Sequence, residues 1–168
     1  LLLRSFDAVA RIDLGYDAEH VLTFRLSGSF SETRDYPGVI QRIDRTIEEL
    51  EALPGVENAA TSSTIPGVGA GFEAEVPLVD APSAAEPRIV AETRFVSPSY
   101  FGTLGIPLVA GEICRQTDRR TLDAVVNRAF VERYFPQRSV LGLRFAGNTT
   151  GLITGIVGDV RELNTLLP

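Results

Sequence analysis

Hydrophobic and polar positions along the chain follow two periodicities, which together predict a mixture of helices and strands. Residues 37–53 repeat apolar side chains at intervals of three and four, namely Ile40, Ile43, Ile47 and Leu50. This spacing places them on one face of a helix, with charged residues on the other. Pro54 cannot continue the hydrogen-bond ladder, so the helix is expected to end before it.

Strand patterns flank this helix on both sides. In residues 20–30, the apolar Leu22, Phe24 and Leu26 alternate with polar residues, as in a strand that buries one face. Residues 56–66 are interpreted as a second strand with small side chains. Strand, helix and strand over about 45 residues predict a βαβ unit with a right-handed crossover.

Shorter elements are expected after residue 66. Alternation in 72–80 and in 88–96 predicts a β-hairpin with a long loop. The stretch SPSYFGTLGIPLVAG, residues 97–111, predicts a short helix that Ser97 or Ser99 caps, followed by a strand or an extended segment. Gly105 is expected to close that helix in the left-handed conformation.

The last part of the chain predicts one more helix between strands. Residues 123–136 indicate a short apolar strand and then a helix that begins near Asn127. Two further strands are expected in 139–147 and 151–163, where glycines indicate bulges or tight bends. The fold class predicted from the whole pattern is α+β.

Composition fits a globular chain and excludes several kinds of site. Apolar residues make up 44% of the 168 residues and charged residues 23%, which is ordinary for a protein with a core. The net charge of −6 argues against a nucleic-acid partner. Cys114 is the single cysteine and His20 the single histidine, so an internal disulfide, a cysteine zinc site and a histidine-rich metal cluster are excluded. The sequence contains no run of about twenty apolar residues, which is the length that a membrane-spanning helix needs.

Catalytic machinery is not visible in the sequence. A small serine hydrolase would need Ser97 or Ser99 as nucleophile, His20 as base and Asp159 as acid, but the G-x-S-x-G elbow is missing. Helix capping accounts for the serines, and Asp159 is interpreted as part of a turn or a surface pair with Arg161. We therefore expect no catalytic residues, no cofactor and no metal site.

Two non-catalytic features remain as candidates. Tyr100, Phe101 and Tyr134 would line the apolar pocket or surface of a ligand-binding module, although core packing is the commoner fate of such rings. The stretch PGVGAGF lacks the Lys-Ser/Thr ending of a phosphate loop. It predicts a hinge instead, formed by Gly67, Gly69 and Gly71.

The order of motifs carries a family resemblance over nearly the whole chain. The motifs are LLLRSF, DLGYDAEHVLTFRL, LEALPGVENAATSSTIPG, FVSPSYFGTLGIPLVAGE, VVNRAFVERYFP, LGLRF and ITGIVGDVRE. This series resembles the extracytoplasmic (periplasmic) core domain of MacB-like ABC transporter permeases, and most of all the acidobacterial-type permease group. SPSYFGTLGIPL and VNRAFVERYFP are the most specific parts.

The resemblance implies a domain layout. Residues 1–16 would be a juxtamembrane segment at the exit from a membrane helix. Residues 17–66 would be the first porter-like βαβ half, an incomplete ferredoxin-like unit. Residues 67–168 would be a mixed α+β lobe like the Sabre domain of the family, with the second porter half missing from the chain. A porter half without its partner would expose a strand edge.

The resemblance also implies a function without chemistry. In the family, a cytoplasmic nucleotide-binding subunit or domain hydrolyses ATP, and the external domain couples that reaction to movement of a substrate or of a periplasmic adaptor or cargo. The chain would then be the extracytoplasmic part of an inner-membrane protein that is anchored through helices outside this chain. The family has no catalytic residues in this domain to carry over.

Overall fold

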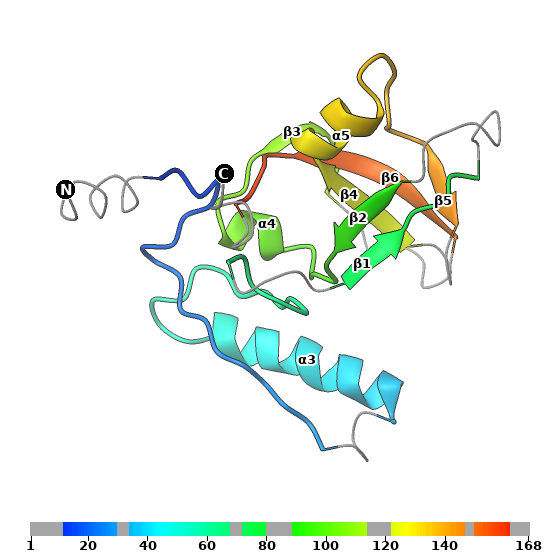
Figure 1. The fold of residues 1–168 in the computed structure, drawn as a ribbon. Helices are drawn as coiled ribbons and strands as arrows, with labels where there is room; N and C mark the ends of the chain where they lie inside the picture. Colours follow the sequence, from blue (N-terminus) through cyan, green and yellow to red (C-terminus); the bar gives the residue numbers. More distant parts are fainter. Residues whose placement is uncertain are drawn as a thin grey trace, which may run out of the picture.

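A computed structural model of the protein describes residues 12–29, 34–67, 72–79, 89–113, 122–146 and 150–161. Over these residues the chain forms the helices α3, α4 and α5 and the strands β1 to β6 (Figure 1). Helices and sheets are mixed along the chain, as the sequence predicts for an α+β fold.

The long helix α3 covers Tyr36–Glu51 and confirms the helix predicted from the apolar spacing. Asp35 caps its first turn, because one carboxylate oxygen accepts a hydrogen bond of 3.2 Å from the amide of Gly38. The apolar face of α3 is only half-buried, and none of its residues joins the two clusters of buried side chains described below. Figure 1 shows α3 set apart from the strands.

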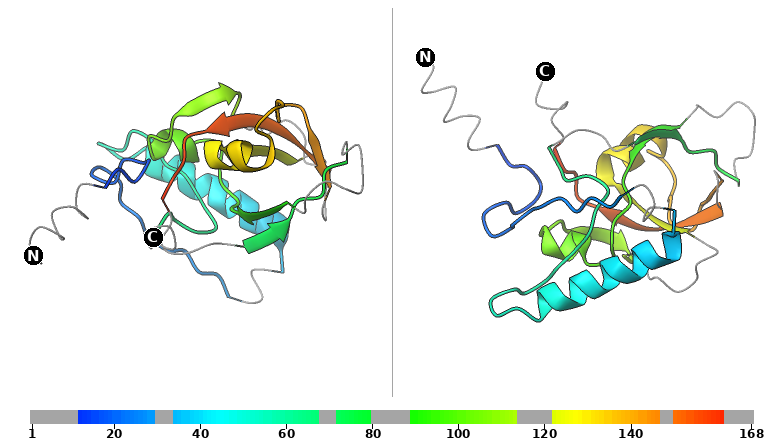
Figure 2. Two further views of the ribbon diagram at one scale, coloured as in Figure 1. Left: turned by 45° about the horizontal axis from the view of Figure 1, so that its top comes forward. Right: turned by 90° about the horizontal axis from the view of Figure 1, so that it is seen from below.

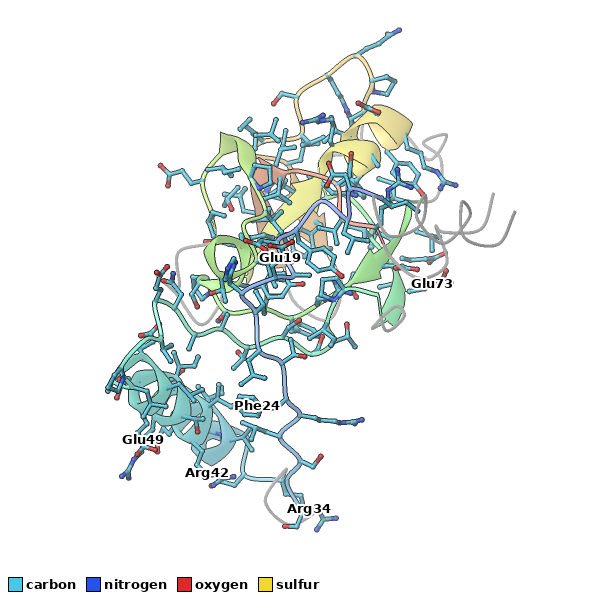
Figure 3. All side chains as sticks on the ribbon, turned by 90° about the vertical axis from the view of Figure 1, so that its left-hand side faces the viewer. Glu19, Phe24, Arg34, Arg42, Glu49 and Glu73 are labelled. Carbon is cyan, nitrogen blue, oxygen red and sulfur yellow. The ribbon has the colours of Figure 1, made fainter. Side chains whose placement is uncertain are left out.

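The strand predicted in residues 20–30 is wrong, since residues 21–29 form no strand. The exposed fractions of Leu22, Phe24 and Leu26 are 87%, 59% and 61%. Figure 3 shows Phe24 on the segment that runs alongside α3. Alternation shows which side chains a strand would bury, but a strand also needs a paired neighbour, and no described residue pairs with this segment.

The second strand of the predicted βαβ unit is also wrong. Residues 56–66 contribute only one isolated bridge, in which Ser62 lies antiparallel to Val96. Two backbone hydrogen bonds of 2.9 Å flank it, from Ser63 to Phe95 and from Ser97 to Thr61. Over the described residues of 17–66, the chain therefore forms the helix of the predicted βαβ unit but not its two strands.

The predicted hairpin is confirmed. Strands β1 (Phe72–Glu75) and β2 (Val90–Thr93) pair antiparallel, with Ala74 opposite Ala91. Val76 continues the pairing through a hydrogen bond of 2.9 Å to the carbonyl of Ile89. Ile89 is buried, whereas Phe95, beyond the end of β2, is 65% exposed.

A four-stranded sheet is built around β6 (Thr150–Val157). Strand β4 (Leu122–Asn127) pairs with β6 in parallel. Strands β3 (Leu108–Gly111) and β5 (Arg144–Ala146) pair with it antiparallel, β5 near its start and β3 near its end. These four strands were all expected from the sequence.

A bulge in β6 distributes its side chains between two clusters. Ala124 pairs with Ile153 and the next residue, Val125, pairs with Gly155, so Thr154 is skipped. The extra residue reverses the alternation of faces along β6. Gly155 is required here, because a Cβ at this position would lie 2.4 Å from the carbonyl oxygen of Glu112. The bulge that the glycines predicted is confirmed.

Two clusters of buried side chains hold the sheet. The first packs under α5 (Arg128–Tyr134), which lies over the sheet in Figure 2. The second packs around α4 (Tyr100–Thr103) and the end of β6. The buried members of the first are Ile89, Phe135, Val140 and Ile153, and those of the second are Tyr100, Leu104, Ile106 and Val157.

Candidate functional site

The hydroxyls of Ser97 and Ser99 are bonded to the segment that follows α3. Ser99 Oγ donates a hydrogen bond of 2.7 Å to the carbonyl of Ala59, and Ser97 Oγ accepts one of 3.0 Å from the amide of Thr61. The two hydroxyl oxygens lie 3.1 Å apart. Ser99 stands at the N-cap position of α4, but its side chain makes no capping bond. The predicted cap by a serine hydroxyl is therefore wrong, because both hydroxyls bind residues 59–61 instead.

The other members of the hydrolase alternative are engaged elsewhere. His20 is exposed, and its Nδ1 lies 3.8 Å from a carboxylate oxygen of Asp17. One carboxylate oxygen of Asp159 accepts a hydrogen bond of 2.7 Å from the amide of Ala129, in the first turn of α5. Asn127 caps the same turn through a 3.1 Å bond from the amide of Phe130. The carboxylate of Asp159, the acid of the hypothetical triad, thus binds the N-terminus of α5. A negative charge is favoured there by the helix dipole.

The three aromatic candidates lie in two different places. Tyr100 is 5% exposed, and its ring meets that of Phe101 edge-on at 5.4 Å between centroids. Tyr134 packs instead with the first cluster, 5.2 Å from the ring of Phe130. Its hydroxyl donates a bond of 2.9 Å to the carbonyl of Val90. The structure brings Tyr100 and Phe101 together and places Tyr134 with the other cluster.

Arg94 forms a polar link that sequence reasoning missed. Its Nε donates a hydrogen bond of 2.9 Å to the hydroxyl of Thr64, and one of its terminal nitrogens lies 3.4 Å from the hydroxyl of Tyr100. The three residues are half-buried or buried. Arg94 therefore ties the segment after α3 to the second cluster. The sequence shows only that Arg94 lies between Thr93 and Phe95 in an alternating strand pattern. That pattern does not predict which residues the guanidinium of Arg94 binds.

The hinge candidate is described only at its first glycine. Gly67 has φ +80°, and a Cβ there would approach nothing closer than the hydroxyl of Tyr16 at 3.8 Å. Gly69 and Gly71 lie outside the described residues. The hinge stays a prediction.

The part of the chain that the structure describes contains neither a cluster of metal ligands nor a membrane-spanning helix. Among the described residues, no three His, Cys, Asp or Glu side chains gather in a way that could hold a metal ion. Cys114 lies outside these ranges. No helix within them has both the length and the apolar character that a membrane crossing requires.

The comparisons with known proteins bear on the fold. No protein-family model matches the chain, and no curated protein matches its sequence. The periplasmic region of MacB from Actinobacillus actinomycetemcomitans matches with a TM-score of 0.50 and 15% identity, over 84% of this chain and 64% of that one. The chain has the fold of the MacB periplasmic region.

A second solved structure is a domain from Porphyromonas gingivalis assigned to a permease protein. It matches with a TM-score of 0.46 and 22% identity, over 69% of this chain and 48% of that one. The chain thus spans less than two thirds of the length of either structure. The MacB-like fold expected from the order of motifs is confirmed, while the acidobacterial-type subgroup stays a prediction.

Proposed function

We propose that the chain is the non-catalytic extracytoplasmic domain of an ABC transporter permease. The observation that carries this proposal is the likeness to the MacB periplasmic region over 84% of the chain. In this function the domain couples ATP hydrolysis by a cytoplasmic nucleotide-binding subunit or domain to movement of a substrate or of a periplasmic partner. Anchoring in the inner membrane belongs to the same proposal.

The bonding of the polar residues supports a mechanical rather than a chemical role. Both serine hydroxyls join backbone segments, and Asp159 holds the first turn of α5. A nucleophile must instead present its oxygen to a base within about 3 Å and to a substrate. Side chains that fix one segment to another suit a body that moves as a unit.

The domain layout is part of the proposal. Residues 1–16 form the juxtamembrane segment, 17–66 the first porter-like half and 67–168 the Sabre-like lobe. The exposure of Leu22, Phe24 and Leu26 supports this division, because a porter half packs its strand against other strands.

Labelling of an engineered cysteine in whole cells tests the location. In the full-length protein with Cys114 and every other native cysteine replaced by Ser, the change Glu132→Cys places a thiol on the exposed side of α5. A membrane-impermeant maleimide is expected to label it in intact spheroplasts. The cysteine-free parent is the control. Labelling that occurs only after lysis would place the domain in the cytoplasm and contradict the proposal.

A second experiment tests the coupling to ATP. The full-length protein is expected to co-purify with an ATP-binding subunit, or to carry such a domain, and its ATPase rate is expected to change when residues 67–71 are stiffened. Replacing Gly67, Gly69 and Gly71 with Ala provides the stiffened variant. Gly102→Ala is the control, because a Cβ there meets nothing within 4 Å. Equal ATPase and transport rates in the two variants would argue against the hinge.

A further inference from the structure

Two segments far apart in the sequence run side by side at one corner of the molecule. The backbone amide of Arg161 donates a hydrogen bond of 3.0 Å to the carbonyl of Leu14, and its Nε donates one of 3.1 Å to the carbonyl of Asp13. Figures 1 and 2 show the start of the described chain and the segment after β6 on the same side of the molecule. We call residues 13–17 and 158–161 together the clamp.

Gly15 gives the clamp its close fit. Its φ is +76°, and a Cβ there would lie 1.9 Å from the carbonyl oxygen of Asp159 and 3.3 Å from the Cα of Val160. A carboxylate oxygen of Asp13 accepts a hydrogen bond of 2.9 Å from the amide of Gly15, which fixes the turn. Because backbone meets backbone here, no flexible side chain can move aside to admit a larger residue.

Both segments of the clamp are also bound to the body. The amide of Asp17 donates a bond of 2.8 Å to the carbonyl of Leu104, at the end of α4. The amide of Gly158 donates one of 2.9 Å to the carbonyl of Pro107, just before β3. Tyr16 and Val160 pack against the second cluster, so apolar contacts cover the same joint.

The clamp reaches the second helix of the lobe through Asp159. Its backbone carbonyl touches the Gly15 position, while its carboxylate accepts the hydrogen bond from Ala129 in α5. One residue thus contacts the incoming segment and the first turn of α5 together. The four residues 158–161 thus contact the incoming chain, the residue before β3 and the first turn of α5, while Asp17 of the incoming chain is bound to the end of α4.

We propose that the clamp is a conformational device that joins the incoming and outgoing chain into one stiff connection. A displacement of the residues before 13 then moves α4, β3 and α5 together. The two segments of the clamp cannot easily slide past each other, because backbone hydrogen bonds join them and Gly15 lies directly against Asp159. A flexible linker would absorb the same displacement. This inference rests on the proposed function in one respect, which is that the displacement comes from the membrane side.

Amide exchange in the full-length protein tests whether Gly15 closes the clamp. We expect Gly15→Ala to raise the exchange rates of the Asp17 and Arg161 amides roughly tenfold, because the added methyl group separates the two segments. Gly55→Ala is the matched control. Gly55 has φ +88° but open space around it, so that variant meets the same backbone strain without the contact. Exchange at these amides that rises equally in both variants, or in neither, would overturn the clamp.

Arg161→Ala covers the case in which Gly15→Ala does not fold. It removes the side-chain bond to Asp13 and keeps the backbone bond to Leu14, so we expect a smaller rise in exchange at Arg161. Arg128→Ala, an exposed arginine of α5, is its control. No difference between these two arginine variants would count against the clamp.

Spin labels measure the stiffness itself. In the same background without native cysteines, labels at Ile12→Cys and Glu132→Cys report the distance from the incoming chain to α5. A narrow distance distribution that broadens with Gly15→Ala and not with Gly55→Ala supports the proposal. A broad distribution in the parent overturns it. A cytoplasmic result in the cell-labelling experiment would instead overturn the proposed function and leave the exchange and distance results as they are.

Discussion

The hydroxyl of Tyr134, in the last turn of α5, donates a hydrogen bond of 2.9 Å to the backbone carbonyl of Val90, the first residue of β2. This bond joins the hairpin to the helix that covers the four-stranded sheet. The ring below the hydroxyl packs against Phe130, while the side chain of Arg133 lies 5.3 Å from its centre. Tyr134 therefore links α5 to β2 through one side chain.

Removing only this hydroxyl is expected to loosen the hairpin. Tyr134→Phe keeps the ring contacts but loses a hydrogen bond, which is worth about 1 kcal/mol of the free energy of unfolding. Urea unfolding followed by circular dichroism measures the difference. Arg128→Ala is the control, since it removes an exposed cation of the same helix and leaves the bond and the contacts of the Tyr134 ring intact. A Tyr134→Phe variant as stable as the parent would show that this hydroxyl does not help to hold the hairpin against α5.

The neighbouring residues Ile153 and Leu152 provide a matched test of the core. Ile153 is 1% exposed in the middle of β6, whereas Leu152 is 36% exposed. Ile153→Ala is expected to lower the free energy of unfolding by about 3 kcal/mol, because it leaves a cavity in the first cluster. Leu152→Ala is expected to cost less than about 1 kcal/mol. Equal losses in the two variants would mean that the first cluster is not the core.

Elements with strong local signals could be predicted from the sequence. The apolar spacing of α3 and the start of α5 near Asn127 are decided within one or two turns of the chain. The bulge at Thr154 follows from the glycine next to it, Gly155. These features depend on neighbours in sequence, which a periodic pattern records.

The predictions that were wrong concern features that depend on residues far away in the sequence. The alternation of Leu22, Phe24 and Leu26 specifies a face to bury, but it does not supply the strand that would pair with it. Ser97 and Ser99 are good caps by residue type, yet their hydroxyls bind Thr61 and Ala59, 36 and 40 residues away. A sequence pattern indicates only that a serine hydroxyl can bond to the backbone of the adjacent helix. In this structure the two hydroxyls bond to the backbone of a distant segment instead.

Glu73 and Glu92 carry like charges, so replacing one of them with a cation is expected to stabilise the protein. These residues lie directly opposite each other across β1 and β2, and both are exposed. Like charges in this arrangement destabilise a strand pair. Glu73→Arg is expected to raise the free energy of unfolding by about 0.3 kcal/mol at low salt, and the gain should shrink in about 1 M salt. Glu57→Arg makes the same charge change away from the hairpin. If both variants gain equally, the net charge and not the pair is responsible.

Replacing Ser97 distinguishes a structural serine from a nucleophile. Ser97→Ala removes the oxygen that accepts the hydrogen bond from the half-buried amide of Thr61. We expect a loss of about 1–2 kcal/mol in the free energy of unfolding, since a buried donor left without a partner costs its desolvation. Faster exchange of the Thr61 amide should accompany the loss. Ser63→Ala is a comparison on the exposed side of the same contact, where water can replace the bond to the Phe95 amide. A Ser97→Ala variant with full stability, but without an esterase activity that the parent shows, would reverse the assignment and restore the hydrolase alternative.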